Sequence, residues 1–309
     1  MKKLLLILSC ISCQISASNL TDYQIVFDSK RSGYQEIHLM NADGSNPSQI
    51  THRKNRMVDH DARWIPGEDR VGFQSYRGRG WRIWTIGIDG KSPKMLTDYG
   101  NYEGEPHWSV NSDEIVFTAY RPAMNLMVVD KEGKVLRQLT HNKNYDVLAD
   151  HPRWSSNGEN ITYISNVDGD FEIFTMDKVG GNVKQLTFNQ SADFSPSFSP
   201  SGDSILYLSD EAGQFDTYIL NLKNGSKKRI SHNPNESSQQ YKAEFMEGSS
   251  TFRSLAPSWS PDGKWIAYFC YIDNNAEICI ADNTGRFVKR ITTNKVHDGA
   301  PSWRLKKVR

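Results

Sequence analysis

The chain has 309 residues, of which 37 are basic and 36 acidic, so its formal net charge is +1. A balance this even provides no strong electrostatic field for nucleic acid or an anionic membrane surface, and we expect no nucleic-acid partner. The length would allow two domains, but the internal repeats described below predict one.

The first eighteen residues have the pattern of a secretory signal peptide. Lys2 and Lys3 supply a positive start, residues 4–11 form a short apolar run, and residues 16–18 are small. This arrangement predicts that residues 1–18 are removed before Asn19 or nearby. We therefore expect a periplasmic or secreted protein whose single domain spans residues 19–309.

Cys10 and Cys13 leave a second interpretation of this segment open. A cysteine that follows an apolar run and a small residue is a candidate for lipid attachment, and Ile7-Leu8-Ser9-Cys10 fits such a site loosely. The alternative is a lipoprotein anchored at Cys10 or Cys13. No other segment has the length and apolar character that predict a transmembrane helix.

An aromatic residue recurs six times along the rest of the chain, at spacings of 44, 46, 44, 61 and 44 residues. Each repeat unit ends in Leu-Thr or a close variant. A period in the mid-forties, with several short strand patterns per unit, is typical of a β-propeller. The aromatic anchors are Trp64, Trp108, Trp154, Phe198, Trp259 and Trp303, and the end markers finish at Thr51, Thr97, Thr140, Thr187, Ser231 and Thr292.

Each unit is expected to hold four strands. In the fourth unit, apolar or β-branched runs bounded by turn residues predict strands at residues 153–155, 161–165, 172–176 and 184–187. The first turn of the sixth unit is Ser260-Pro261-Asp262-Gly263. It suits a type I turn, because proline presets the φ angle of the second turn position.

The two ends of the chain are expected to share one blade. The first unit has three strand patterns, at residues 25–29, 36–40 and 48–51, and the missing Pro-x-Trp strand occurs at residues 300–304. The predicted fold is an all-β, six-bladed propeller of four-stranded antiparallel blades, closed by the C-terminal strand. Closure removes open sheet edges, and we expect a monomer. We interpret the aromatic anchors as packing between blades.

Cys270 and Cys279 lie on the second and third predicted strands of the sixth unit. If Ile272 pairs with Glu277, the antiparallel register places the two cysteines directly opposite each other, where an oxidising compartment favours a disulfide. The alternative is two separate buried thiols, because cross-strand disulfides are geometrically demanding. Either interpretation makes the pair structural.

The repeat Pro-x-Trp-Ser-Pro-Asp-Gly, followed by Ile-x-Tyr-x-Ser, Gly and Leu-Thr, resembles the propeller repeat of the TolB family. The resemblance covers residues 23–304. It implies a periplasmic propeller that binds protein partners in the cell envelope. The family adds an N-terminal α/β domain, which we do not expect here because the first repeat begins close to the signal segment.

Two further families with similar repeats bear on catalysis. Prolyl oligopeptidase-type peptidases carry such a propeller beside an α/β-hydrolase domain, but the sequence contains no Gly-x-Ser-x-Gly nucleophile motif. The repeat also resembles that of oligogalacturonate lyases, bare propellers in which histidines and a glutamine hold a metal over the channel. This second resemblance implies an alternative function, a metal-dependent oligosaccharide lyase or hydrolase.

The connections between units are expected at one mouth of the channel. They contain His60, His151 and His297, which are candidate partner contacts or, in the alternative, ligands of a divalent metal. The competing interpretation is that the neighbouring acidic residues cap turns and bond loop amides. The three histidines lie at different offsets from their aromatic anchors, which argues against one shared metal site. These acidic residues are Asp59, Asp61, Glu103, Glu105, Asp150, Asp193 and Asp298.

The connection over residues 232–256 has 25 residues, whereas the others have 8 to 11. Long loops in compact domains often carry function, so we interpret this one as a flap with Tyr241, Phe245 and Met246 as candidate partner contacts. The alternative is a surface insertion. We interpret the basic stretch at residues 77–82 as an exposed turn.

These observations favour a non-enzymatic module that needs no cofactor. We expect it to bind an envelope protein or peptide through the loops at the channel mouth. The metal-dependent lyase remains the alternative.

Overall fold

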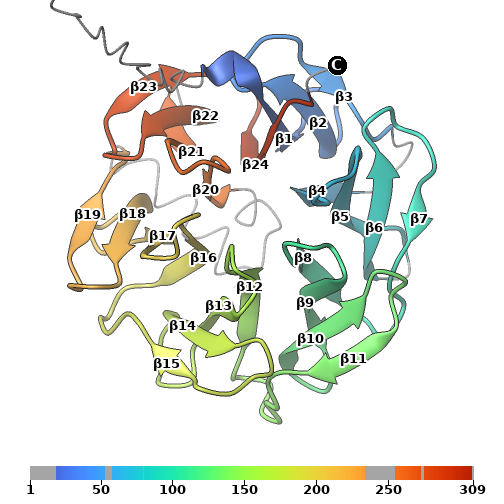
Figure 1. The fold of residues 1–309 in the computed structure, drawn as a ribbon, viewed down its shortest axis with the longest axis vertical. Helices are drawn as coiled ribbons and strands as arrows, with labels where there is room; N and C mark the ends of the chain where they lie inside the picture. Colours follow the sequence, from blue (N-terminus) through green and yellow to red (C-terminus); the bar gives the residue numbers. More distant parts are fainter. Residues whose placement is uncertain (1–18, 53–57, 79, 234–254, 273–274, 308–309) are drawn as a thin grey trace, which may run out of the picture.

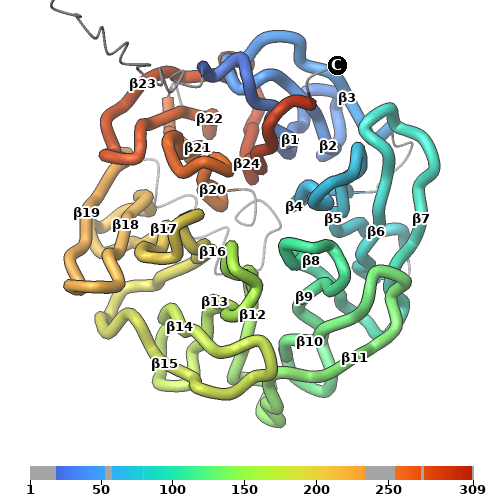
Figure 2. Tube along the Cα trace, in the orientation of Figure 1, coloured from blue at the N-terminus to red at the C-terminus, as the bar shows by residue number. Residues whose placement is uncertain are grey.

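The computed structural model describes residues 19–52, 58–78, 80–233, 255–272 and 275–307. Within these residues, six sheets of four antiparallel strands stand radially around a central axis (Figures 1 and 2). The predicted six-bladed propeller is confirmed. We number the blades 1 to 6 along the chain.

In every blade the first strand named below lies nearest the axis and the last lies outermost. A 3-10 helix, η1 (Leu20–Asp22), precedes β1. Blade 1 contains β24 (Asp298–Leu305), β1 (Tyr23–Ser29), β2 (Glu36–Asn41) and β3 (Ser48–Gln49); blade 2 contains β4 (Val58–Trp64), β5 (Arg70–Tyr76), β6 (Trp81–Gly87) and β7 (Lys94–Met95); blade 3 contains β8 (Glu103–Trp108), β9 (Glu114–Tyr120), β10 (Met124–Asp130) and β11 (Val135–Gln138). Blade 4 contains β12 (Ala149–Trp154), β13 (Asn160–Ser165), β14 (Glu172–Asp177) and β15 (Lys184–Gln185); blade 5 contains β16 (Asp193–Phe198), β17 (Ser204–Ser209), β18 (Asp216–Asn221) and β19 (Lys227–Arg229); blade 6 contains β20 (Ser258–Trp259), β21 (Trp265–Ile272), β22 (Asn275–Asp282) and β23 (Phe287–Arg290).

The ring closes as the sequence predicted, because the last strand pairs with the first. In β24, Trp303 lies opposite Ile25 of β1 and Ser302 lies opposite Val26. Figure 1 shows β24, in red, beside β1, in blue. Blade 1 therefore joins strands from the two ends of the described chain.

The innermost strands of blades 1 to 5 each contain a β-bulge, so they extend further towards the N-terminus than the sequence pattern indicates. In blade 4, β12 starts at Ala149 and not at residue 153, and its register with β13 shifts between Asp150 and Arg153. A bulge interrupts the alternation of inward and outward side chains by which a strand is recognised in a sequence. Sequence analysis therefore missed the first half of this strand. In five blades the residue three before the anchor has a left-handed φ of 46–54°: Asp61, Glu105, His151, Ser195 and Ala300.

The core lies between blades. Trp64 of blade 2 packs in one cluster with Val26 and Ile37 of blade 1, and its indole Nε1 donates to the carbonyl of Ser302 at 2.9 Å. Trp108 of blade 3 presses so closely on blade 2 that a Cβ on Gly72 would lie 1.7 Å from its ring. These contacts confirm that the anchors pack neighbouring blades together.

The recurrent Leu-Thr marker has one structural role in all six blades. Its hydroxyl accepts a hydrogen bond from a backbone N–H of the third strand, fourteen residues earlier, at 2.7–3.1 Å. The fourth strands are short, so the hydroxyl continues their ladder by one bond. The accepting residues are Thr51, Thr97, Thr140, Thr187, Ser231 and Thr292.

Replacing one such hydroxyl should destabilise the ring. Thr97→Val keeps the shape of the side chain but leaves the buried N–H of Ile83 without its acceptor. We expect a loss of about 1–3 kcal/mol in the free energy of unfolding, measured in urea. Thr97→Ser, which matches Ser231, is the control and should cost clearly less; equal losses in both variants would contradict the assigned role.

Candidate functional site

The ring has two distinct ends. At the first, which we call the loop face, the connections between blades meet the turns between second and third strands, as where Leu148 N donates to Asn166 Oδ1 at 2.7 Å. At the second, the turn face, the turns between first and second strands meet, as where Ser112 Oγ donates to the carbonyl of Pro66 at 2.8 Å. The predicted site residues that the structure describes belong to the loop face and to the channel below it.

The three predicted histidines are held by separate partners. His60 in β4 is hydrogen-bonded to Gln74 Nε2 at 2.8–2.9 Å and lies edge-on to the Trp81 ring. His151 in β12 has Nδ1 at 3.5 Å from Asp150. His297, just before β24, accepts through Nδ1 from the backbone N–H of Ala276 at 3.0 Å. Among the described residues, no three His, Cys, Asp or Glu side chains form a group that could hold a metal.

The acidic residues of the predicted mouth are buried and mainly stabilise the connections. Glu103 accepts from the backbone N–H of Tyr99, Asp193 from the side-chain amide of Asn189 at 2.9 Å, and Asp298 from that of Asn294. This is the capping role that sequence analysis set against a metal site. The sequence placed these residues in loops, whereas most of them lie in the innermost strands.

The bulges bring a charged cluster into the channel between blades 2, 3 and 4. Asp61 makes ion pairs with Arg63 and, at 3.4 Å, with Arg153, which also contacts Glu105 at 3.2 Å. Burial would raise the pKa of Asp61, but the two guanidinium groups lower it below its usual range. Burial, and then the charge of Asp61, raise the pKa of Glu105 to about 8. The cluster thus combines two guanidinium groups with two carboxyl groups whose pKa values are shifted in opposite directions.

Glu172 of blade 4 is followed thirteen residues later by a glutamine, whereas the corresponding acids of blades 5 and 6 are followed by an arginine that pairs with them. The acidic residue that opens the third strand pairs with an arginine thirteen residues later in blade 6, Glu277 with Arg290 at 2.9 Å. In blade 4 this position is Gln185, whose amide donates to Asp168 and to the carbonyl of Thr187. Burial, and after it the charge of Asp193, raise the pKa of Glu172 to about 7.

A cavity of about 590 Å³ opens at the turn face, at the end of the channel opposite the predicted mouth. All six blades line it with the ends of their innermost strands, and blades 2 to 6 add the turns that follow these strands. Arg63, His107 and Arg153 are among its lining residues. Sequence analysis missed this cavity, because its lining residues are spread over the whole chain.

Three pairs of aromatic and arginine side chains lie on the loop face over blades 2 to 4. Tyr76 lies 5.6 Å from Trp81, Arg121 stacks over Tyr99 at 5.3 Å, and Tyr120 lies 5.9 Å from Tyr145. Between these pairs, Arg82 joins the turn of blade 2 to the next connection through Asp98 at 2.7 Å. We call Tyr76, Trp81, Arg121, Tyr120 and Tyr145 the tyrosine–arginine strip. Tyr76 and Tyr120 are each 37% exposed and Tyr145 is 61% exposed.

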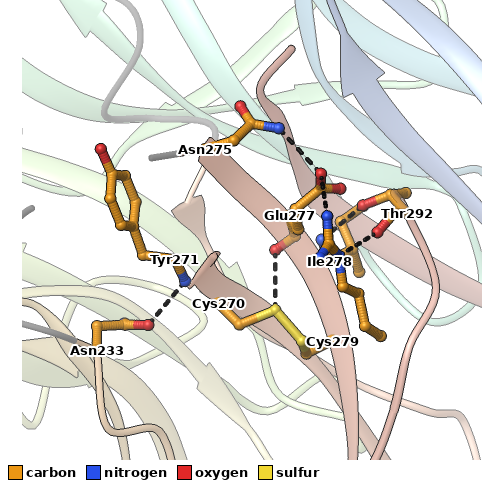
Figure 3. The surroundings of a disulfide bond; sticks show 9 residues. Asn233, Cys270, Tyr271, Asn275, Glu277, Ile278, Cys279 and Thr292 are labelled. Atoms are coloured by element: carbon orange, nitrogen blue, oxygen red, sulfur yellow. Dashed lines mark hydrogen bonds and ion pairs between the residues drawn. A yellow bond between two sulfur atoms is a disulfide. The ribbon is translucent and has the colours of Figure 1, made fainter. Parts of the chain in front are cut away.

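Cys270 in β21 and Cys279 in β22 form a disulfide with Cα atoms 5.8 Å apart (Figure 3). The predicted register was wrong: Ile272 pairs with Asn275, so Cys270 lies opposite Glu277 and Cys279 opposite Tyr268. The disulfide therefore joins diagonal positions. Figure 3 shows Glu277 beside it, bonded to Asn275 at 2.9 Å.

Several predicted features lie outside the described residues. They are the signal segment 1–18 with Cys10 and Cys13, and the candidate contacts Tyr241, Phe245 and Met246. In the described part of the chain, no helix has the length and apolar character needed to span a bilayer.

Comparison with known proteins gives one family match. Residues 142–252 match the TolB beta propeller domain family, PD40. A TolB homolog from Chlorobium luteolum is 30% identical over 160 residues, which cover 52% of this chain and 35% of that protein. The Tol-Pal system protein TolB from Anaeromyxobacter dehalogenans is 24% identical over 168 residues, 52% of this chain and 37% of that protein. The chain thus spans less than half the length of these relatives.

Solved structures share the fold at lower identity. TolB from Acinetobacter baumannii superposes with a TM-score of 0.75 at 18% identity, covering 92% of this chain and 67% of that one. An oligogalacturonate lyase in complex with manganese superposes with a TM-score of 0.55 at 10% identity, covering 86% of this chain and 73% of that one. At these identities the likeness concerns the fold alone.

Removal of the disulfide should destabilise blade 6. The two cysteines are nine residues apart, and a loop of this size predicts a loss of about 2–3 kcal/mol for Cys270→Ala combined with Cys279→Ala, measured by urea unfolding. A thiol reductant should lower the stability of the unmodified chain similarly and leave the double variant unchanged. An unmodified chain insensitive to reductant under unfolding conditions would contradict this expectation.

Glu172 should make stability depend on pH. Because its pKa is raised from 4.5 to about 7 in the folded chain, its protonated form favours folding. Its contribution should be complete below pH 4.5 and be lost as the pH rises through 7. The difference in unfolding free energy between the unmodified chain and Glu172→Gln, measured from about pH 4 to 8, should show this fall.

Gln185→Arg supplies the partner that Glu277 has in blade 6 and should flatten the fall, because a nearby cation lowers a carboxyl pKa. If the stability of Gln185→Arg followed the same pH curve as that of the unmodified chain, the assignment to Glu172 would be wrong.

Proposed function

We propose that this chain, a TolB-like propeller with PD40 repeats, is a non-enzymatic module that binds a protein or peptide partner of the cell envelope through its loop face. The observation that carries the proposal is the tyrosine–arginine strip. It places five side chains of the types enriched in protein interfaces on one end of a rigid ring.

The strip has the physical properties of a binding surface. Tyrosine and tryptophan offer large contact areas with few rotatable bonds, so little conformational entropy is lost when a partner covers them. Arg121 is already oriented, since its Nε donates to the carbonyl of Tyr99 at 3.0 Å. Because neighbouring blades hold these groups in place, binding would require little reorganisation.

The relatives support the same class of function. One of them is named as a protein of the Tol-Pal system, and two relatives and one solved structure carry the TolB name. The resemblance to that family implies envelope partners and export of the chain. The loop face also carries the ends of the long connection, where Asn233 Oδ1 accepts from the backbone N–H of Tyr271 at 2.9 Å.

The metal-dependent lyase finds less support in the described residues. It requires His60, His151 and His297 to share a ligand, whereas each ring is engaged by a different neighbour. The likeness to an oligogalacturonate lyase rests on fold alone. We therefore do not propose this reaction.

Photo-crosslinking tests the binding function directly. Replacing Tyr120 or Tyr145 with benzoylphenylalanine in cells should produce a discrete crosslinked species, whereas the same replacement at Phe287, exposed on the outer strand β23, should not.

For the captured partner, Tyr120→Ala with Tyr145→Ala should weaken binding at least about tenfold, because interface aromatics often each contribute more than about 1 kcal/mol. Phe287→Ala is the control. Equal crosslinking from all three positions would contradict the proposal.

A further inference from the structure

The cavity at the turn face has the size and shape of a small-molecule site. Its volume of about 590 Å³ lies within the usual range for ligand pockets. The five turns between first and second strands, together with the end of β24 in blade 1, surround its entrance, so every blade contributes to its boundary. It lies at the opposite end of the channel from the tyrosine–arginine strip.

The walls of this cavity are largely apolar. Trp64, Trp108 and Trp154 are more than nine-tenths buried between blades, and the remaining edges of their rings line the cavity. Val110 and Leu305 stand at its rim, 59% and 51% exposed. Such walls favour the apolar body of a ligand, because its surface leaves water on binding.

The inner end of the cavity is polar. The residue directly before each aromatic anchor lies there, and these residues are Arg63, His107, Arg153, Ser197, Ser258 and Ser302. His107 Nδ1 accepts from the backbone N–H of Trp154 at 3.2 Å, so the proton of its neutral ring is on Nε2. The hydroxyl oxygens of Ser197 and Ser258 are buried and, within the described part of the chain, have no hydrogen-bond partner, so a rotation about χ1 is needed to turn either hydroxyl into the cavity.

These groups share the ability to donate hydrogen bonds. Arginine offers only donors, His107 offers Nε2–H, and each serine offers a hydroxyl proton. Two of these groups, Arg63 and Arg153, are also cationic, and both make ion pairs with Asp61. The complementary ligand group is therefore an anionic oxygen acceptor.

We infer that the turn-face cavity binds a small organic carboxylate with an apolar body. The carboxylate lies at the inner end, near Arg63, Arg153 and Ser258, and the apolar body lies against the tryptophan edges. The source is a free small molecule, because the volume of the cavity matches such ligands. This site is separate from the proposed partner surface, and its test does not depend on that partner.

The first test compares matched ligands on the full chain. 1-Naphthylacetate and its neutral amide have the same apolar body, and calorimetric titration should show at least tenfold tighter binding of the acid. Equal affinities, or no heat from either compound at millimolar concentration, would overturn the inference. Tighter binding of an acetylated tripeptide with a free C-terminus than of 1-naphthylacetate would also overturn it, because the cavity would then recognise peptide ends.

Two variants locate the site. Val110→Trp places a large side chain at the rim and should weaken binding of 1-naphthylacetate at least tenfold. Val167→Trp, at a position 61% exposed in the turn between β13 and β14 on the loop face, is the matched control and should leave affinity unchanged. If the two variants bound 1-naphthylacetate equally, the site would lie elsewhere.

A third variant tests the donors without disturbing the buried ion pairs. Ser258→Ala removes one hydroxyl at the inner end and should weaken binding of the acid several-fold while changing binding of the amide less. Circular dichroism of the unliganded variant should match that of the unmodified chain. An unchanged affinity for the acid would remove Ser258 from the site and contradict the proposed orientation.

Discussion

The structure depends on the fact that no blade can bury its own sheet. Apolar residues form clusters between neighbouring blades, as where Trp303 of blade 1 packs with Ala267 and Ile278 of blade 6. Each sheet needs a neighbour on either face, and only a closed ring gives every blade two neighbours. Closure by β24, the aromatic anchors and the glycine at position 72 all serve this constraint.

Much of this architecture could be predicted, because the chemistry repeats in every blade. The turn that follows the anchor in blades 2 to 6 and the hydroxyl at the end of each blade are local requirements, so they recur in the sequence, as at Thr97 and Thr187. The bulges could not be predicted. Glycine commonly marks a left-handed φ in a sequence, but here Asp61 and His151 adopt that conformation. The register at Cys270 was missed because β21 and β22 stay paired as far as Ile272 and Asn275, which shifts every pair along the ladder by two residues from the expected one.

The candidate sites were harder to predict than the fold, for a physical reason. A bulge turns polar side chains such as Asp61 and Arg153 towards the axis, where residues from different blades meet. Distances between blades do not follow from positions within a repeat. The sequence marked the three histidines as one group, whereas the structure assigns each to a different local network. The turn-face cavity needs all six blades, and no single segment carries its pattern.

The position of β24 also orders events during synthesis. In blade 1, Trp303 of β24 lies opposite Ile25 of β1, so this blade is completed only after β24 has been synthesised. Until then β1 presents an unpaired edge, and the apolar face of blade 1 that blade 6 later covers is open to water. Pairing over such a sequence separation carries a high entropic cost and is intrinsically slow. The emerging chain is therefore most exposed to aggregation just before its final strand arrives.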